Sequence, residues 1–316
     1  MKDRVPETGH REPGQPRQDR SVVQESVPGP RSPVPREGGE GTLYVVATPI
    51  GNLGDLSSRA REVLGAVVLV LAEDTRRIRQ LLTHFGLRTA TRSLHDHNEA
   101  RELPGLLARL SAGQSLALVS DAGTPVIADP GFRLVRACRE RGIPVLVVPG
   151  PSAVTAAVAV AGLPPQPFTF GGFLPARPGP REALLAGLAS VGHSLVLFLS
   201  PHRLPAELAA CRDVLGGERE AALLAELSKL HERCERGTLT SLAAWARDAV
   251  PRGEYTLVVG PPPDTPPAEA DAQAAQAALD AELARGQTLP EARRAAARRL
   301  GLSRRQLYEL LTARRR

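Results

Sequence analysis

Residues 117–131 have the sequence Ala-Leu-Val-Ser-Asp-Ala-Gly-Thr-Pro-Val-Ile-Ala-Asp-Pro-Gly, in which a short apolar run ends in Ser-Asp and a Gly-Thr-Pro turn. Such a run is typical of a buried strand, and Asp129 with the Pro and Gly that follow it indicates the start of a helix. The arrangement places a carboxylate and backbone amides at the carboxyl edge of a parallel sheet, where open α/β folds bind ligands. The alternative is an ordinary strand–turn–helix junction.

Two further junctions of this kind occur in the first half of the chain. Thr48-Pro-Ile-Gly-Asn-Leu-Gly-Asp55 follows one apolar run, and Pro149-Gly-Pro-Ser-Ala153 follows another. Glycines directly after a strand let backbone amides approach a ligand closely. The first turn has an alternative role, because Asp55 and Ser57 can cap the next helix. Three such junctions in succession indicate one composite cleft.

The alternation of apolar runs and helical patterns predicts a parallel sheet with crossover helices. We expect strands at 43–47, 67–72, 116–120 and 145–148, and helices at 57–64, 75–85, 98–112, 131–141 and 152–161. After Gly162 the pattern restarts, with strands expected at 168–173, 195–200, 221–227 and 255–260. The predicted fold class is therefore α/β, with two α/β domains over residues 41–163 and 164–262.

The two ends of the chain differ from this pattern. Residues 1–40 are rich in Pro, Gly, Arg and Glu without apolar periodicity, so we expect a disordered tail. The prolines at 261–267 predict a semi-rigid linker, and residues 263–316 are expected to form this linker and a small C-terminal helical domain. Capping boxes at Thr288–Glu291 and Ser303–Gln306 open two helices, a pattern similar to a helix-turn-helix, although other small helical hairpins give the same pattern.

The excess positive charge is local. Residues 285–316 hold ten Arg and two acidic residues, a net charge of +8, so the rest of the chain carries a net charge of −2. Localised Arg is typical of a phosphate-binding surface, and the alternative is a solvated helical tail. No stretch approaches the roughly 20 apolar residues of a membrane span, and the N-terminus has no signal-peptide core. We therefore expect a cytoplasmic protein with no membrane partner.

Five segments together resemble the tetrapyrrole-methylase superfamily: Leu43–Asp55, Ala72-Glu-Asp-Thr-Arg76, Leu94-His-Asp-His-Asn-Glu99, Val119–Pro125 and Pro149–Ala153. The resemblance runs from about residue 41 to the C-terminus and is to a branch that methylates ribosomal RNA. It implies two α/β domains with S-adenosylmethionine in the cleft between them, and a homodimer. It further implies 2′-O-methylation of a cytidine ribose in the decoding region of 16S rRNA, with the small ribosomal subunit as the partner.

The resemblance also implies a set of cofactor-binding residues. Carried over position by position, the superfamily's contacts fall in all three turns and in the second domain: on Leu53, on Val119, Ser120, Asp121 and Thr124, on Ser152 and Ala153, and on Leu199. The Ser-Asp-Ala-Gly-Thr-Pro turn is longer than its counterpart in the tetrapyrrole enzymes. The assignment of cofactor contacts after Asp121 therefore depends on how the two turns are aligned.

Two positions depart from the branch's pattern. Leu199 stands where the branch usually has Glu, and Ala225 stands where it usually has Arg. Loss of an acid and a base together suggests that the two formed a pair, since a lone buried charge costs about 3 to 5 kcal/mol. We therefore expect residues 199 and 225 to lie on neighbouring strands.

Methyl transfer from a sulfonium to a hydroxyl is an in-line displacement, so alignment in a dry cleft is the main contribution expected of the enzyme. A base or a cation near the developing alkoxide also helps, because a ribose hydroxyl is a poor nucleophile near neutral pH. Our candidate catalytic residues are His97, Asp55 and Lys229. The sequence leaves the identity of the base open.

The cluster His95-Asp-His-Asn-Glu99 has two other interpretations. Its two imidazoles suit a metal ion, but no third ligand is marked and sulfonium methyl transfer needs no metal, so we expect none. Asp96 and Asn98 alternatively cap the helix that begins near Glu99.

Two rival functions remain open at this point. One is a methyltransferase of the same fold that acts on a tetrapyrrole or a protein side chain, for which the Arg-rich C-terminal domain has no use. The other is a non-catalytic RNA-binding ribosome-assembly factor, which predicts no affinity for S-adenosylmethionine.

Overall fold

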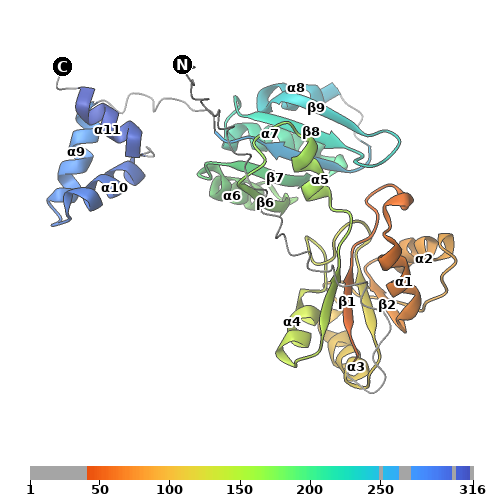
Figure 1. The fold of residues 1–316 in the computed structure, drawn as a ribbon. Helices are drawn as coiled ribbons and strands as arrows, with labels where there is room; N and C mark the ends of the chain where they lie inside the picture. Colours follow the sequence, from red (N-terminus) through yellow and green to blue (C-terminus); the bar gives the residue numbers. More distant parts are fainter. Residues whose placement is uncertain (1–40, 249–251, 263–271, 301–303, 314–316) are drawn as a thin grey trace, which may run out of the picture.

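The computed structural model describes residues 41–248, 252–262, 272–300 and 304–313. The chain forms two α/β units and a third group of helices (Figure 1). This confirms the predicted fold class of two α/β units followed by C-terminal helices. The tail expected at 1–40 and the capping box expected at Ser303 lie outside the described residues.

The first sheet has the order β3-β2-β4-β1-β5, and all of its pairings are parallel. Its strands are β1 (Leu43–Val46), β2 (Leu69–Ala72), β3 (Thr91–Ser93), β4 (Leu116–Val119) and β5 (Val145–Val148). The inner strands β1, β2 and β4 are apolar because helices cover both faces of the sheet. The sequence analysis missed β3, because Thr-Arg-Ser forms a half-buried edge strand without an apolar run.

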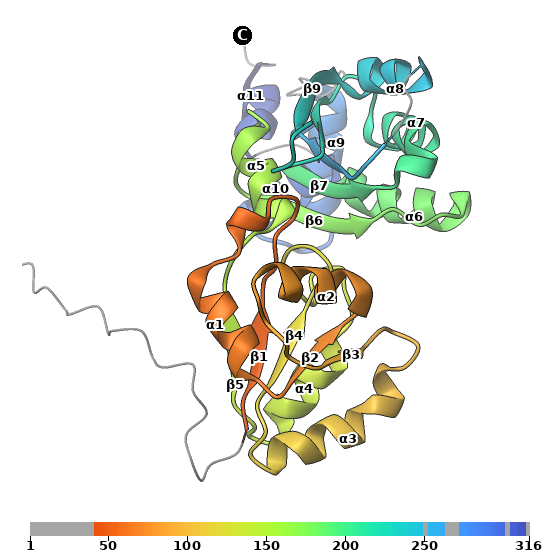
Figure 2. The same ribbon diagram turned by 90° about the vertical axis from the view of Figure 1, so that its right-hand side faces the viewer.

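The helices of the first unit divide between the two faces of this sheet, as the ribbon shows (Figure 2). One face packs against α1 (Ser58–Ala66) and α2 (Thr75–His84), and the other against α3 (Glu99–Ser111) and α4 (Phe132–Glu140). The turn after β1 leads into α1 and the turn after β4 leads into α4. Neighbouring strands β1 and β4 thus send their connections to opposite faces, and a crevice opens where they diverge.

The second sheet is mixed, with the order β6-β7-β10-β8-β9. Its strands are β6 (Phe168–Phe173), β7 (Ser194–Leu199), β8 (Glu220–Ala225), β9 (Arg233–Thr238) and β10 (Tyr255–Val259). Only β6 and β7 pair in parallel, and the other three pairings are antiparallel. The sequence analysis missed β9 because Arg-Cys-Glu-Arg-Gly-Thr has the polar composition of an exposed edge strand.

Two sets of helices cover the second sheet. One face packs against α6 (Pro178–Ala189), α7 (Leu204–Leu215) and α8 (Leu239–Asp248). The other face packs against α5 (Ala153–Val160), which begins directly after β5 of the first sheet. Helix α5 therefore joins the two units, because the chain that leaves the first sheet is buried against the second.

The C-terminal helices are α9 (Ala272–Leu283), α10 (Leu289–Arg299) and α11 (Arg304–Ala313), which share a small apolar core. The Glu291 carboxylate accepts hydrogen bonds from the Thr288 backbone N–H at 3.0 Å and from the Thr288 hydroxyl at 2.6 Å. Glu291 thus makes the backward hydrogen bond of the predicted capping box. Among the described residues, no helix has the length and apolar character needed to cross a membrane.

Candidate functional site

The turns after β1 and β4 are bound to each other at the carboxyl edge of the first sheet. Thr48 and Gly123 exchange backbone hydrogen bonds of 2.9 and 3.0 Å, and the Thr48 hydroxyl donates to the carbonyl oxygen of Ser120 at 2.9 Å. The third turn joins them where the Thr124 hydroxyl donates to the carbonyl oxygen of Pro151 at 3.2 Å. The three junctions found in the sequence therefore form one continuous surface.

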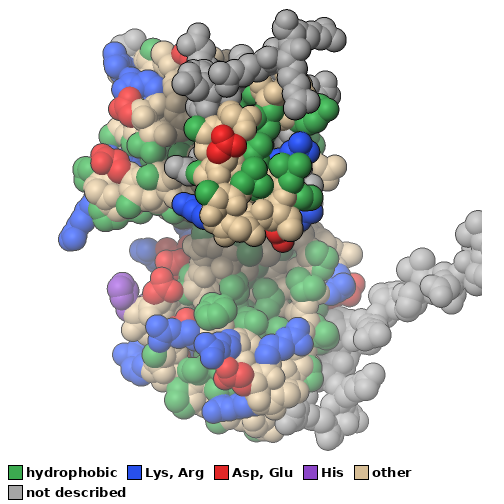
Figure 3. Space-filling view, turned by 90° about the vertical axis from the view of Figure 1, so that its left-hand side faces the viewer, with side chains coloured by type: hydrophobic (Ala, Val, Ile, Leu, Met, Phe, Trp, Pro, Cys, Tyr) green, Lys and Arg blue, Asp and Glu red, His purple; other side chains and the backbone are tan. Residues whose placement is uncertain are grey.

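A cavity of about 530 Å³ lies between this surface and the second sheet. Its volume falls within the roughly 300–1,000 Å³ of small-molecule sites. The first unit supplies most of its polar lining, namely Glu73, Arg77, Ser120, Asp121, Thr124, Asp129 and Ser152. The second unit supplies aromatic and apolar side chains, namely Phe173, Phe198, Leu199 and Tyr255, together with Ser200, Arg203, Glu254 and Thr256. In the space-filling view the surface is hollowed between the upper and lower bodies (Figure 3).

Three carboxylates shape the electrostatics of the cavity. The Ser120 hydroxyl donates to Asp129, and Asp121 accepts from the backbone N–H of Asp74 at 2.9 Å. Burial and the charges of Asp121 and Asp129 raise the pKa of Glu73. Burial also raises the pKa of Asp129, although the hydrogen bond from Ser120 opposes the shift. The wall attracts positive charge, and Glu73 accepts a proton more readily than an ordinary glutamate.

The backbone is strained beside the cavity and in the turn after β8. Val126 and Ala128 have φ values of 74° and 65°, a region that side chains with a Cβ rarely adopt and that is least favourable for β-branched Val. Glu226 and Ser228, in the turn after β8, have φ values of 56° and 66°. Strain of this kind persists only where the surroundings enforce it, and it is frequent at ligand sites.

Most of the residues predicted to bind the cofactor meet at this cavity. Ser120, Asp121, Thr124, Ser152, Ala153 and Leu199 all line it. Val119 is buried in the core behind the wall, with 3 % of its surface exposed. Leu53 lines a second cavity of about 320 Å³, on the other side of the Thr48 turn. The structure thus brings six of the eight residues together.

Asp55 and Lys229 meet at a seam between the two units, which we define as the contact of residues 51–55 with residues 226–229. The Ser228 hydroxyl donates to Asp55 Oδ2, and the Lys229 stem lies so close to Gly51 that a Cβ there would collide with Lys229 Cγ. Lys229 Nζ donates to Glu226 at 2.9 Å and to Glu254 at 3.2 Å. Burial alone lowers the pKa of Lys229, but these two carboxylates outweigh it and raise the pKa. Lys229 is therefore a cation near neutral pH.

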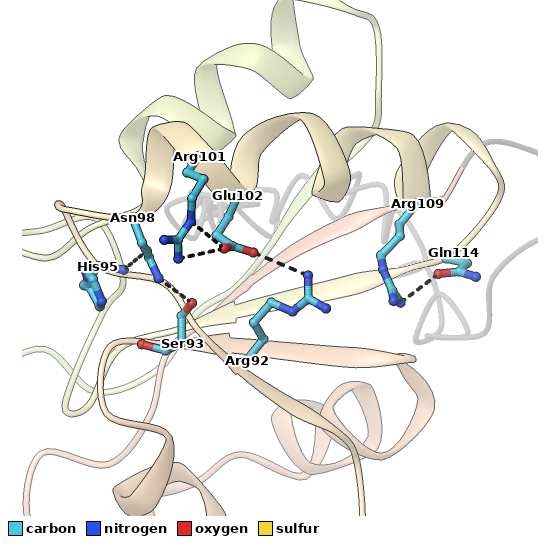
Figure 4. A network of polar contacts seen from close by, with 8 residues as sticks. All are labelled: Arg92, Ser93, His95, Asn98, Arg101, Glu102, Arg109 and Gln114. Atoms are coloured by element: carbon cyan, nitrogen blue, oxygen red, sulfur yellow. Dashed lines mark hydrogen bonds and ion pairs between the residues drawn. The ribbon is translucent and has the colours of Figure 1, made fainter.

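His97 lies in the loop before α3 and is not among the residues that line the large cavity. Its ring is 6.0 Å from that of His95, measured between centroids. The Asn98 side chain accepts from the His95 N–H at 2.8 Å and donates to the Ser93 carbonyl oxygen at 3.1 Å (Figure 4). Asn98 occupies the N-cap of α3, but its side chain closes this loop and forms no capping bond.

The expected adjacency of residues 199 and 225 is wrong. Strand β10 lies between β7 and β8, and Tyr255 faces Leu199 on one side and Ala225 on the other. Directly opposed residues share a face of the sheet, so the two positions are separated by two strand spacings, roughly 9 to 10 Å. All three side chains are buried in the core beneath α6, α7 and α8.

Several cavity residues were absent from the sequence predictions. Glu73 and Arg77 flank the Asp74 N-cap of α2, and neither was predicted to be a functional residue. Phe173, Phe198 and Glu254 come from three different strands or their ends, and no local motif marks them. Among the described residues, no group of three His, Cys, Asp or Glu side chains is placed to hold a metal ion.

The fold and the cavity define a class of protein in which two α/β units enclose a ligand site at the carboxyl edge of a parallel sheet. Residues 42–243 match the tetrapyrrole (corrin/porphyrin) methylase family, and the chain belongs to this family. The solved structure of diphthine synthase is 16% identical with a TM-score of 0.56, over 70% of this chain and 89% of that one. Uroporphyrin-III C-methyltransferase from Thermus thermophilus, in complex with S-adenosylhomocysteine, is 19% identical with a TM-score of 0.50, over 70% of this chain and 97% of that one.

A curated relative is much more similar in sequence than these structures. Ribosomal RNA small subunit methyltransferase I of Synechocystis sp. is 45% identical over 271 residues, which cover 85% of this chain and 97% of that protein. This similarity confirms the prediction that the chain resembles the branch of the superfamily that methylates ribosomal RNA.

Proposed function

We propose that this protein transfers a methyl group from S-adenosylmethionine to the ribose 2′-hydroxyl of a cytidine in the decoding region of 16S rRNA. The observation that carries the proposal is the cavity between the two sheets, whose one wall is acidic and amide-rich and whose other wall is aromatic. The similarity over nearly the full length of a ribosomal RNA small subunit methyltransferase supports the choice of substrate. The finer parts of the proposal, which are the cytidine ribose and the decoding region, rest on the resemblance of the five sequence segments to the superfamily.

The residues of the cavity fit S-adenosylmethionine. The cofactor carries a sulfonium and an ammonium cation, and Glu73, Asp121 and Asp129 form a negative wall for them. Its adenine ring is apolar on both faces, and Phe173 and Phe198 offer ring surfaces, with centroids 5.1 Å apart. Its polar edges suit the hydroxyls of Thr124 and Ser152. We therefore retain Ser120, Asp121, Thr124, Ser152, Ala153 and Leu199 as cofactor-binding residues.

When bound, the cofactor supplies an electrophilic methyl group. The protein aligns the ribose oxygen with that methyl carbon, and alignment in a closed site accounts for most of the acceleration expected. The O–C bond forms as the C–S bond breaks, and the hydroxyl proton passes to a base on the protein. The aromatic wall of the second unit excludes water from this line of approach.

Among the candidate bases, we favour Glu73. It lines the cavity, and its raised pKa brings it nearer to the range of effective bases at neutral pH. Lys229 remains a catalytic candidate as a cation near the developing alkoxide, since it is charged and pairs with Glu254 at the cavity rim. Asp55 at the seam and His97 in the loop before α3 also remain candidate catalytic residues.

The proposed partner is the small ribosomal subunit, which places the protein in the cytoplasm. The Arg-rich segment from residue 285 onward is the proposed phosphate-binding surface. We also propose a homodimer, because edge strand β5 carries two exposed apolar residues, Leu146 and Val147, with 44% and 59% of their surfaces accessible.

The deciding experiment incubates the protein with labelled S-adenosylmethionine and small ribosomal subunits, then maps the label. We expect one cytidine of 16S rRNA to become resistant to alkaline cleavage on its 3′ side, because a 2′-O-methyl group blocks that reaction. Deletion of residues 264–316 is expected to reduce methylation of subunits while leaving S-adenosylhomocysteine affinity unchanged in calorimetry. Label in a tetrapyrrole or protein, or failure to bind the cofactor at all, overturns the proposal in favour of one of its rivals.

A further inference from the structure

We propose that the second cavity, of about 320 Å³, is the binding site for the target nucleotide, which it holds splayed out of the RNA strand. The inference rests on the proposed function and adds to it the location of the substrate. The cavity lies between the turn after β1 and one face of α2. It is lined by Thr48, Pro49, Leu53, Arg77, Ile78, Gln80, Leu81, His84 and Asp121.

The spacing of residues along α2 explains this lining. Positions 77, 80, 81 and 84 follow the i, i+3, i+4, i+7 pattern, so they form one stripe on the helix. Ile78, Leu81 and Leu82 pack in the core of the first unit, and Ile78 and Leu81 also border the cavity. The stripe therefore presents a guanidinium, an amide and an imidazole to the cavity from a rigid element.

The chemistry of the lining suits a nucleotide. Leu53, 42% exposed, and the Leu81 side chain provide apolar surface for the face of a base. The His84 ring is fixed by an edge-to-face contact with Phe85, with centroids 4.9 Å apart, and imidazole is one of the rings on which RNA bases stack. The Gln80 amide both donates and accepts, as recognition of a base edge requires.

These polar groups are also available to a ligand. Within the described part of the chain, neither the Gln80 amide nor the His84 ring makes a hydrogen bond. Both side chains are exposed to water on the same stripe as Arg77, so a nucleotide can bind them without breaking a contact within the protein.

The second cavity lies next to the first. Among the described lining residues, Arg77 and Asp121 are the two common to both cavities. The Thr48 turn borders the smaller cavity and is hydrogen-bonded to Ser120 and Gly123, which line the larger one. A base in the smaller cavity would direct its ribose toward the shared wall and its phosphate toward Arg77. This is the arrangement that brings a 2′-hydroxyl to a methyl group in the larger cavity.

The volume limits the occupant to a single nucleotide. About 320 Å³ is at the lower end of the range for ligand pockets, and a base pair does not fit such a space. Enzymes that modify a nucleotide inside folded nucleic acid commonly extrude it into a pocket of this kind.

The test uses Gln80→Ala and His84→Ala, because these residues line the second cavity and not the first. We expect each variant to lower kcat/KM for small ribosomal subunits by about tenfold or more, the loss typical of removing a base contact. Affinity for S-adenosylhomocysteine should stay within about twofold of the wild type, since it binds in the larger cavity, which neither Gln80 nor His84 lines. The matched control is Arg79→Ala on the same helix, whose side chain faces the other way and donates to Thr91 at 3.0 Å.

A second measurement does not depend on activity. Cytidine 5′-monophosphate is titrated into the full chain loaded with S-adenosylhomocysteine while the imidazole signals are followed by NMR, with His84→Ala identifying the His84 signal. A shift at His84 that saturates supports the site. Wild-type kcat/KM in both cavity variants, or an unmoved His84 signal with shifts elsewhere, overturns it. If the wild type binds the nucleotide at His84 but methylates no ribosomal RNA, the proposed function fails and the nucleotide site stands.

Discussion

The two sheets contribute to the large cavity in different ways. The first is entirely parallel, so its strands end at one edge and their turns gather carboxylates, hydroxyls and backbone amides there. The second is mixed, and residues near the ends of β6, β7 and β10 face the cavity mainly with aromatic and aliphatic side chains. The first unit therefore supplies the polar groups of the cavity, and the second supplies an apolar wall that would exclude water.

The largest expected effect comes from the polar wall. Glu73→Gln should lower kcat on small ribosomal subunits by about 10² to 10⁴-fold, because the amide does not accept the hydroxyl proton. S-adenosylhomocysteine affinity should fall far less than kcat, because Asp121 and Asp129 keep the wall negative. Burial and the charges of Asp121 and Asp129 raise the pKa of Glu73 above the ordinary value of 4.5, so wild-type activity should fall as the pH drops through that raised pKa.

The pH dependence of the rate distinguishes a catalytic base from an acidic residue with a structural role. The acidic limb of the pH–rate profile should disappear in Glu73→Gln and persist in Glu62→Gln, an exposed glutamate on α1 that serves as the control. Wild-type turnover by Glu73→Gln would show that the base lies elsewhere and would return attention to His97, Asp55 and Lys229.

The second prediction concerns the apolar cover. Leu199→Glu buries a carboxylate beside Tyr255 and should lower the free energy of unfolding by roughly 3 to 5 kcal/mol, as measured by urea denaturation. Adding Ala225→Arg should restore less than half of this loss, because Tyr255 separates the two positions. Leu230→Glu is the control, with 93% of that side chain exposed and an expected change within about 0.5 kcal/mol. Full restoration by the double variant would mean that the pair reaches across Tyr255.

The smallest effect is expected at the seam. Ser228→Ala removes the hydrogen bond to Asp55 between the units and should cost about 1 kcal/mol of unfolding free energy in the same assay. Exposed Ser190→Ala on α6 is the control and should be neutral. Equal stability of both variants would show that packing of the Lys229 stem on Gly51, and not this hydrogen bond, holds the seam.

The parts of the fold that follow local rules were predictable from the sequence. Apolar runs located β1, β2, β4 and β5, and glycine-containing turns after three of these strands located the cofactor edge. Strands β3 and β9 were missed, since an edge strand with a polar face has no distinctive hydrophobic period.

The candidate site was predictable only in part. Ser120, Asp121 and Thr124 lie within one motif, and the motif fixes their position. Phe173 and Phe198 reach the cavity through the pairing of β6 with β7, which sequence does not specify. The order of β7, β10 and β8 likewise decides that residues 199 and 225 are not neighbours, because the central strand comes last in the chain.

The shared wall between the two cavities has a thermodynamic consequence. Arg77 and Asp121 each face both cavities, so a molecule that fixes their positions on one side changes the surface offered on the other. Equilibrium linkage makes any such effect reciprocal: the factor by which the cofactor changes affinity for RNA equals the factor by which RNA changes affinity for the cofactor. The wall formed by Arg77 and Asp121 would thus couple the two binding equilibria, so that occupancy of one cavity changes the affinity of the other.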